Sequence, residues 1–429
     1  MKRIVKVVAL VLLCMVLILP TSALETLGSI NQPTDLIDSP ETVINMYRTC
    51  EDTDYSIRKQ YTLFSFSGTP DYTLYILNPY GYAILLNETN GLLEACYLED
   101  ADLCIDVENN RQYYYGGPGV YCTYEKGEFI NHFDKRVISD ADVSVLTERE
   151  LDVKAYETNK AQILATGSSG NNERGNSTRT VTETFYAGYA YFSTLSNYGR
   201  NVNGTCTVIA TQMLLGYYDY YANDSFVATT YEQNNGTTET FHQILNNYVY
   251  GTSQQGGIFI HNAAPGINDY LQDRGLLCSL NSVYSSQNAV IGKIQETLQN
   301  GEPLIASMGT HCNALYNHTV LIYGVTYDSG NPIGTAVVTM HMGWQSTSVD
   351  GQSTKQYVAS AGWFYECGYI QSNCTLHTMT AWQNKDAIYH WRGCRKCTHF
   401  EEGKHSDSWN SVLAKCTKCG RTGAGGLEG

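Results

Sequence analysis

The chain has 429 residues, of which 43% are hydrophobic and 16% charged, and its formal net charge is −15 at pH 7. An acidic chain disfavours nucleic acids and anionic membranes as partners, so we expect neither. The length exceeds that of one typical core and predicts two or three domains.

The first 23 residues have the three parts of a secretory signal peptide. Lys2 and Arg3 begin it, residues 4–19 are apolar apart from Lys6, and small residues precede a cut expected after Ala23. Removing the three positive residues takes the formal net charge from −15 to −18. Later stretches do not approach the roughly 20 apolar residues that a membrane span needs. We therefore expect a secreted protein with no membrane span.

Residues 24–165 read as one α+β module without a catalytic constellation. An Asn-Gly pair at Asn90 predicts a tight turn between two strands. The expected elements are a helix over 41–48 and strands over 72–77, 82–86 and 92–97.

Residues 166–180 are small and polar without apolar periodicity, which predicts a flexible linker. Arg174 and Arg179 offer cleavage points to a processing protease, and a plain tether between domains is the alternative.

Residues 181–391 predict a second domain, followed by a polar tail rich in Cys and Lys over 392–429. Apolar residues at helical spacing predict a helix over 206–222. The other expected elements are a helix over 290–298 and strands over 185–193, 303–308, 318–326, 335–342 and 362–365. Helices followed by strands indicate an α+β fold class.

Cys206 lies where a loop becomes this helix, directly after Gly204 and Thr205. The free N–H groups and the dipole at a helix start favour a thiolate, so Cys206 is a candidate nucleophile. A buried or disulfide-bonded cysteine is the alternative. Thirteen cysteines follow the one in the leader, and an odd number in a secreted chain points to a free thiol.

His318 begins one predicted strand and His341 ends the next. A two-residue turn at Ser329-Gly330 would place these histidines opposite each other on one face, about 5 Å apart. His318 could then act as the base and His341 could orient its ring. Pro332 could enlarge the loop and shift this register.

These segments resemble papain-like cysteine peptidases, most closely the streptopain-type enzymes that Gram-positive bacteria secrete. The resemblance covers roughly residues 185–370 and rests on the helix-start Cys206, Gly301-Glu-Pro-Leu-Ile, the strand from His318 to Gly324, and Gly343-Trp344. It implies a papain-like catalytic domain over 181–391, and an inhibitory pro-region over 24–165 that contacts it. It also implies hydrolysis of protein or peptide substrates without a catalytic cofactor.

Two positions differ from the family pattern. His341 stands where the family has an orienting Asn. The oxyanion Gln is absent, and Asn201, five residues before Cys206, could donate a comparable hydrogen bond. The implied reaction is thiolate attack on a peptide carbonyl, protonation of the leaving amine by His318, and hydrolysis of the acyl-enzyme.

Two other functions stay open. The Cys-His-His order is also similar to that of cell-wall cysteine peptidases and amidases that cut peptidoglycan. Drift at the Asn and Gln positions would fit a non-catalytic adhesion or binding protein on a peptidase scaffold.

Two Cys-x-x-Cys pairs, separated by 18 residues, occupy the tail. This spacing predicts one tetrahedral, structural zinc site of the zinc-ribbon type, and two disulfides are the alternative in an exported chain. His377 and His390 show no partner at metal spacing and are expected to be ordinary surface or core residues. The predicted ligands are Cys394, Cys397, Cys416 and Cys419, with His399 or His405 as substitutes or neighbours.

Overall fold

The computed structural model describes residues 39–48, 53–99, 105, 111–132, 135–169, 182–200, 204–251, 257–308, 318–343, 356–375, 377–384, 389–405, 408–410 and 415–418. All of them belong to one compact unit. The unit mixes helices with a large antiparallel sheet, which is compatible with the predicted α+β class.

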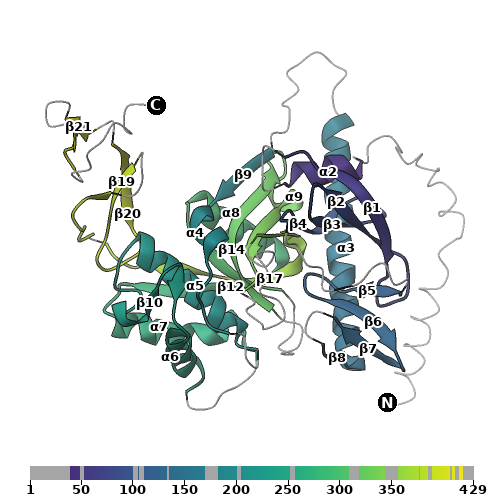
Figure 1. Cartoon of the computed structure of the whole chain (residues 1–429), viewed down its shortest axis with the longest axis horizontal. Coiled ribbons are helices and arrows are strands. Elements are labelled where there is room, and N and C mark those ends of the chain that lie inside the picture. The colour runs from purple at the N-terminus through teal and green to yellow at the C-terminus, as the bar shows by residue number, and fades with distance from the viewer. Residues whose placement is uncertain are drawn as a thin grey trace, which may run out of the picture. The chain divides into compact units, whose positions relative to one another are not determined.

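The central sheet has eleven strands that come from two parts of the chain (Figure 1). The first part supplies β1 (Ser56–Leu63), β2 (Tyr72–Asn78), β3 (Tyr82–Leu86) and β4 (Leu92–Cys96). The second supplies β9 (Thr182–Tyr186), β12 (Cys278–Tyr284), β13 (Leu304–Met308), β14 (His318–Asp328), β15 (Val337–His341), β16 (Tyr357–Ser360) and β17 (Phe364–Ser372). The order is β1-β2-β3-β4-β16-β15-β14-β13-β17-β12, with β9 also paired to β14. The β4–β16 pair joins the two parts into one continuous sheet.

The first part also contains a second sheet and a long helix. The predicted hairpin is confirmed: β3 and β4 pair antiparallel, and Asn90 has the positive φ of +52° that its turn requires. The predicted short helix is also confirmed. The remaining elements are α2 (Pro40–Met46), β5 (Tyr113–Tyr115), β6 (Tyr121–Glu125), β7 (Glu128–Asn131), β8 (Val137–Ile138) and α3 (Asp140–Ser169).

Helices cover both faces of β14. The predicted helix beginning at Cys206 is confirmed as α5 (Cys206–Tyr221), which packs with α6 (Glu239–Tyr250) and α7 (Ile260–Asp273) against Leu321 and Tyr323. On the other face, α8 (Gln287–Gln299) packs against Val320 and Ile322. Because side chains alternate along a strand, β14 is buried on both sides and forms the centre of the core.

Two local predictions are wrong. Residues 185–193 do not form one strand, because β9 ends at Tyr186 and α4 (Tyr189–Thr194) follows after Gly188, which has φ +73°. The predicted linker begins as helix, because α3 continues through residues 166–169. The rest of that linker lies outside the described residues.

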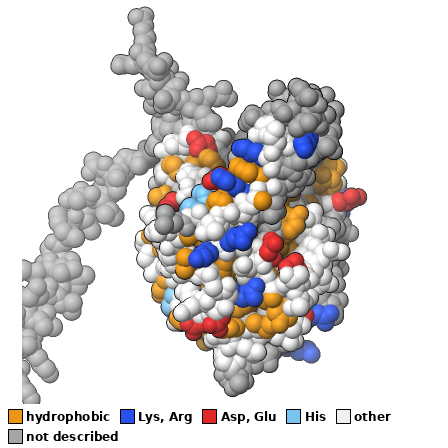
Figure 2. All heavy atoms as spheres, turned by 90° about the vertical axis from the view of Figure 1, so that its left-hand side faces the viewer, with side chains coloured by type: hydrophobic (Ala, Val, Ile, Leu, Met, Phe, Trp, Pro, Cys, Tyr) orange, Lys and Arg blue, Asp and Glu red, His pale blue; other side chains and the backbone are white. Residues whose placement is uncertain are grey.

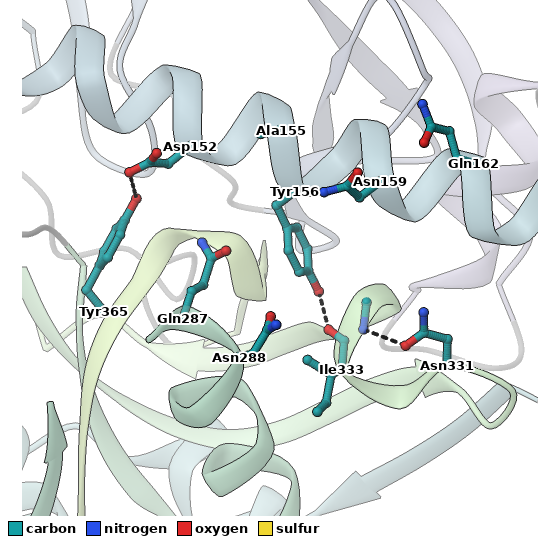
Figure 3. Close-up of a pocket in the computed structure, with 11 residues that line it drawn as sticks. Asp152, Ala155, Tyr156, Asn159, Gln162, Gln287, Asn288, Asn331, Ile333 and Tyr365 are labelled. Atoms are coloured by element: carbon teal, nitrogen blue, oxygen red, sulfur yellow. Dashed lines mark hydrogen bonds between the residues drawn. The ribbon is translucent and has the colours of Figure 1, made fainter. Parts of the chain in front are cut away.

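Helix α3 contacts the second part of the chain along a polar seam (Figure 3). The Tyr156 hydroxyl donates to the carbonyl of Ile333 at 2.9 Å, and the Tyr365 hydroxyl donates to the Asp152 carboxylate at 3.0 Å. A groove of about 850 Å³ lies between α3, the start of α8 and the short helix α9 (Pro332–Thr335). The contact between the two parts is therefore partly hollow and hydrogen-bonded.

A buried carboxyl group lies at the β4–β16 junction between the two parts of the chain. The Glu94 side chain is fully buried on β4 and accepts hydrogen bonds from Tyr82, Tyr115 and Tyr121. The Tyr82 hydroxyl also forms a hydrogen bond with the hydroxyl of Tyr357 on β16. Burial raises the pKa of Glu94.

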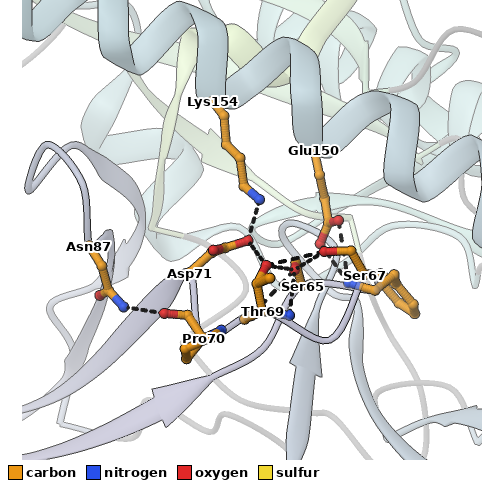
Figure 4. Close-up of polar contacts among 9 residues, drawn as sticks. Ser65, Ser67, Thr69, Pro70, Asp71, Asn87, Glu150 and Lys154 are labelled. Atoms are coloured by element: carbon orange, nitrogen blue, oxygen red, sulfur yellow. Dashed lines mark hydrogen bonds and ion pairs between the residues drawn. The ribbon is translucent and has the colours of Figure 1, made fainter.

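Glu150 and Lys154 of α3 contact the loop between β1 and β2 (Figure 4). Lys154 pairs with Asp71, and a Glu150 oxygen accepts the Phe66 N–H at 3.3 Å. Burial raises the pKa of Glu150 to about 7.

The tail is built from short strands that contact the main body. They are β18 (Gln383–Asn384), β19 (Tyr389–Gly393), β20 (Phe400–Lys404), β21 (Trp409–Asn410) and β22 (Lys415–Cys416). The Leu277 N–H donates to the carbonyl of Lys396 at 2.6 Å, and Gly393 lies directly against the carbonyl of Ala222, which caps α5.

Positive and negative side chains are interspersed on the described part of the face shown in Figure 2. Among the helices that the structure describes, none combines the length and the apolar character needed to cross a membrane.

Candidate functional site

Cys206 is the first residue of α5, and the chain before it accounts for the helix start. Gly204 has φ +80°, a conformation that residues with a side chain rarely adopt. The Thr205 carbonyl accepts from the Ile209 N–H at 3.1 Å, while the Thr205 side chain makes no capping hydrogen bond. The Thr205 side chain therefore does not cap the N–H groups of the first turn. The positive end of the helix would stabilise a negative charge beside Cys206.

Gln212 ties the segment before Cys206 to α5. Its side chain is fully buried, and its Oε1 accepts the Gly199 N–H at 2.8 Å. Its Nε2 donates to the Thr237 hydroxyl at 2.9 Å and to the Thr238 carbonyl at 3.0 Å. These hydrogen bonds restrain the backbone at Gly199, which precedes the start of α5.

The starts of α5 and β14 meet. The Thr319 N–H donates to Sγ of Cys206 at 3.4 Å, and the hydroxyls of Thr207 and Thr319 lie 2.8 Å apart. Because Thr319 directly follows His318, the structure brings two of the predicted catalytic residues into one region. Both are almost fully buried, Cys206 at 5% and His318 at 9% exposure.

The His318 ring is oriented by a main-chain carbonyl. Its Nε2 lies 2.6 Å from the carbonyl oxygen of Met342. A carbonyl oxygen only accepts, so Nε2 carries a proton and, in the neutral ring, Nδ1 is the acceptor nitrogen. Sequence reasoning missed Met342 because a backbone contact leaves no side-chain pattern.

The predicted pairing of His318 with His341 is wrong. His341 pairs with Leu321, because α9 enlarges the loop before β15. His318 lies three residues before Leu321, so the two histidines do not sit opposite each other across β14 and β15. The His341 ring is fully buried, its Nδ1 accepts the Gly343 N–H at 3.0 Å, and it packs edge-on against Tyr198.

Burial keeps the catalytic candidates neutral. It raises the pKa of the Cys206 thiol, although hydrogen bonds from Thr319 and Thr207 act in the opposite direction. Burial also lowers the pKa of His318 to about 4, against the effect of the Met342 carbonyl, and the positive charge of Arg149 lowers it further. At neutral pH this form holds a thiol and an uncharged imidazole.

Two predicted site residues lie outside the described residues. They are Asn201, the expected oxyanion donor, and Cys419, one of the expected zinc ligands.

The structure does not gather the described predicted zinc ligands in one place, because the described cysteines of the tail separate into two clusters. One cluster contains Cys374, His377, Cys394 and Cys397. The other contains His390, His405 and Cys416. In each cluster the donor atoms lie within 4.8 Å of one another. Cys416 is therefore not grouped with Cys394 and Cys397.

The first cluster could hold a metal ion. Sγ of Cys374 lies 3.9 Å from Sγ of Cys394, and Sγ of Cys397 lies 3.4 Å from Nδ1 of His377. Tetrahedral zinc with ordinary bond lengths separates two sulfurs by about 3.8 Å and a sulfur from a nitrogen by about 3.6 Å. No disulfide joins any two described cysteines. The spacing Cys374-x-x-His377 was a sequence signal for this cluster and was overlooked.

No protein-family model matches the chain, and no curated protein matches it. Among solved structures, the chain is similar to a fragment of prointerpain A from Prevotella intermedia, with 13% sequence identity and a TM-score of 0.35. The alignment covers 72% of this chain and 97% of that one. We assign neither family nor function from a likeness at this level.

Proposed function

We propose that the chain is a secreted, papain-like cysteine endopeptidase made as a zymogen, with Cys206 as nucleophile and His318 as general base and acid. The observation that carries the proposal is the 3.4 Å hydrogen bond from the Thr319 N–H to Cys206 Sγ. It links a cysteine at a helix start to the strand that begins with a histidine.

The proposed reaction uses the groups at this meeting point. Nδ1 of His318 takes the thiol proton, and the Cys206 thiolate attacks a peptide carbonyl. The imidazolium then protonates the leaving amine, and water hydrolyses the thioester. The Met342 carbonyl stabilises the imidazolium by accepting from Nε2, and first-turn N–H groups of α5 would stabilise the oxyanion.

The described form fits a latent enzyme. Proton transfer from Cys206 to His318 creates two charges, and burial disfavours both. Arg149 of α3 adds a positive charge that opposes the imidazolium, and its guanidinium lies 4.6 Å from the centre of the Trp363 ring. Activation would therefore require the module that carries α3 to move or be removed.

Thiol labelling tests the proposal, using a protease site inserted between Gly170 and Thr180. Iodoacetamide should alkylate Cys206, and protein hydrolysis should appear, only after this site is cut. Cys206→Ser should abolish both. Cys367→Ser, which replaces another buried cysteine, is the matched control and should retain both.

Three outcomes would overturn parts of the proposal. Unchanged hydrolysis and thiol-reagent sensitivity in Cys206→Ser would exclude Cys206 as nucleophile. Release of peptides from purified cell wall but not from protein would favour a peptidoglycan peptidase. Labelling without hydrolysis of either substrate would favour a non-catalytic binding protein.

We also propose that the first tail cluster binds a structural zinc ion, because its donor separations match a tetrahedral site. Zinc there would hold the backbone that contacts Leu277. Chelation should release zinc and make the tail sensitive to proteases, and Cys394→Ser should have the same effect. An equally resistant tail in the zinc-free chain would contradict this role.

A further inference from the structure

The tail buries metal-type ligands instead of an apolar core. None of the four hydrophobic clusters formed by the described residues includes a residue beyond Ile370. Apart from Thr398, the side chains described as buried beyond residue 375 are all Cys or His: His390, Cys394, Cys397, His405 and Cys416. Cys and His are the side chains that most often bind zinc.

His390, His405 and Cys416 come together from three strands. His390 lies on β19, His405 directly follows β20, and Cys416 ends β22. Each is 0% exposed. Sγ of Cys416 lies 3.5 Å from Nδ1 of His390, and the two imidazole rings have centres 5.4 Å apart. The sulfur–nitrogen separation agrees with the roughly 3.6 Å of two ligands on one tetrahedral zinc ion.

The backbone around His390 leaves room for its ring. Gly403 pairs with His390 across β19 and β20, and a Cβ at Gly403 would lie 2.9 Å from Nε2 of His390. On another side, the Trp382 ring meets the His390 ring edge-on, with centres 4.7 Å apart. The imidazole is thus held between a glycine and an aromatic ring, which limits its orientation.

The Trp382 ring that contacts His390 also contacts two cations. Arg392 lies over the Trp382 ring at 4.8 Å and Lys418 lies over it at 4.2 Å. Neutral imidazole nitrogens and a thiolate are the forms that bind zinc. One divalent ion could be bound by all three donor atoms, which lie within 4.8 Å of one another.

We propose that His390, His405 and Cys416 form a second structural site for a divalent zinc-type ion, separate from the Cys374 cluster. The tail would then bind two ions. The first ion lies in the part of the tail that contacts the main body, and the second joins β19, β20 and β22. With so small an apolar core, these strands would depend on the ion for their fold.

Metal counting tests this proposal on the full secreted chain carrying Cys206→Ser, which prevents self-cleavage. Elemental analysis should find two zinc ions per chain. Cys416→Ser should reduce the content to one, as should Cys394→Ser/Cys397→Ser, which removes the other cluster. Cys122→Ser replaces a buried cysteine of the first module and should retain two. One zinc ion in the parent, or two in Cys416→Ser, would overturn the second site.

X-ray absorption keeps the test decisive if Cys416→Ser fails to fold. The zinc remaining in Cys394→Ser/Cys397→Ser should show imidazole ligands together with sulfur. Absence of imidazole scattering, or absence of zinc in that variant, would overturn the proposal. Because metal content is measured without turnover, this result is independent of whether the chain is a peptidase.

Discussion

Glu150→Gln should remove a pH dependence that this carboxyl imposes on stability. Its pKa rises from the ordinary 4.5 to about 7 in the folded chain because the group is buried. A raised folded-state pKa means that the folded chain holds the proton more tightly than the unfolded chain. The group therefore contributes stability below about pH 4.5 that is lost as the pH rises to about 7.

The magnitude follows from that interval. At about 1.36 kcal/mol for each tenfold change in proton affinity, the full loss is about 3.4 kcal/mol. Between about pH 5 and about pH 8 the loss is about 2.5 kcal/mol, because part of the titration precedes pH 5. Glu150 is only 2% exposed, so solvent screening should reduce this loss of stability only slightly.

Urea unfolding of the Cys206→Ser chain at these two pH values measures the effect. In Glu150→Gln the amide oxygen can still accept the Phe66 N–H, but the group no longer titrates. The stability difference between the two pH values should shrink by about 2.5 kcal/mol. Glu148→Gln, an exposed position on the same helix, should leave it unchanged. The reasoning is refuted if Glu150→Gln keeps the parental difference.

Three further changes test other contacts. Arg149→Met removes a positive charge that opposes the imidazolium, so the pKa of His318 should rise in an NMR titration, and an unchanged or lower pKa would count against this. Gly393→Ala would place a Cβ 1.7 Å from the Ala222 carbonyl oxygen and should lower the free energy of unfolding by about 1–3 kcal/mol, with earlier proteolytic release of the tail. Gly292 lies inside α8, and a Cβ added there would lie 3.9 Å from Cδ1 of Ile333, an ordinary contact distance. Gly292→Ala should therefore raise that free energy by about 0.5–1 kcal/mol, and a decrease would contradict the helix argument.

The sequence predicted the elements that carry strong periodicity. Helix α5, helix α8 and strand β14 were recognisable because apolar residues repeat at the spacing of their burial. Helix α3 was not recognised, since it buries charged residues such as Arg149, Glu150 and Glu157 that give no apolar stripe.

The contacts of the candidate site could be predicted only in part. Cys206 and His318 were chosen from their positions at element starts, and the structure places both starts together. The predicted pairing of His318 with His341 was wrong because α9 adds a helical turn to the loop. Pro332 permits this turn but does not require it. The sequence grouped the candidate metal ligands by their spacing, whereas the structure places Cys416 beside His390 of β19 and His405, which follows β20.

The β4–β16 pairing would have a consequence for the proposed activation by cleavage after α3. Cutting the chain breaks no hydrogen bond between Leu92–Cys96 and Tyr357–Ser360, so the severed module can stay bound. If it leaves, β16 becomes an edge strand with open N–H and C=O groups, which invites pairing with another chain. That edge could then receive an extended polypeptide by strand addition or nucleate self-association. The departure of the module would thus expose an unpaired strand edge that other chains can bind, in addition to exposing Cys206 and His318.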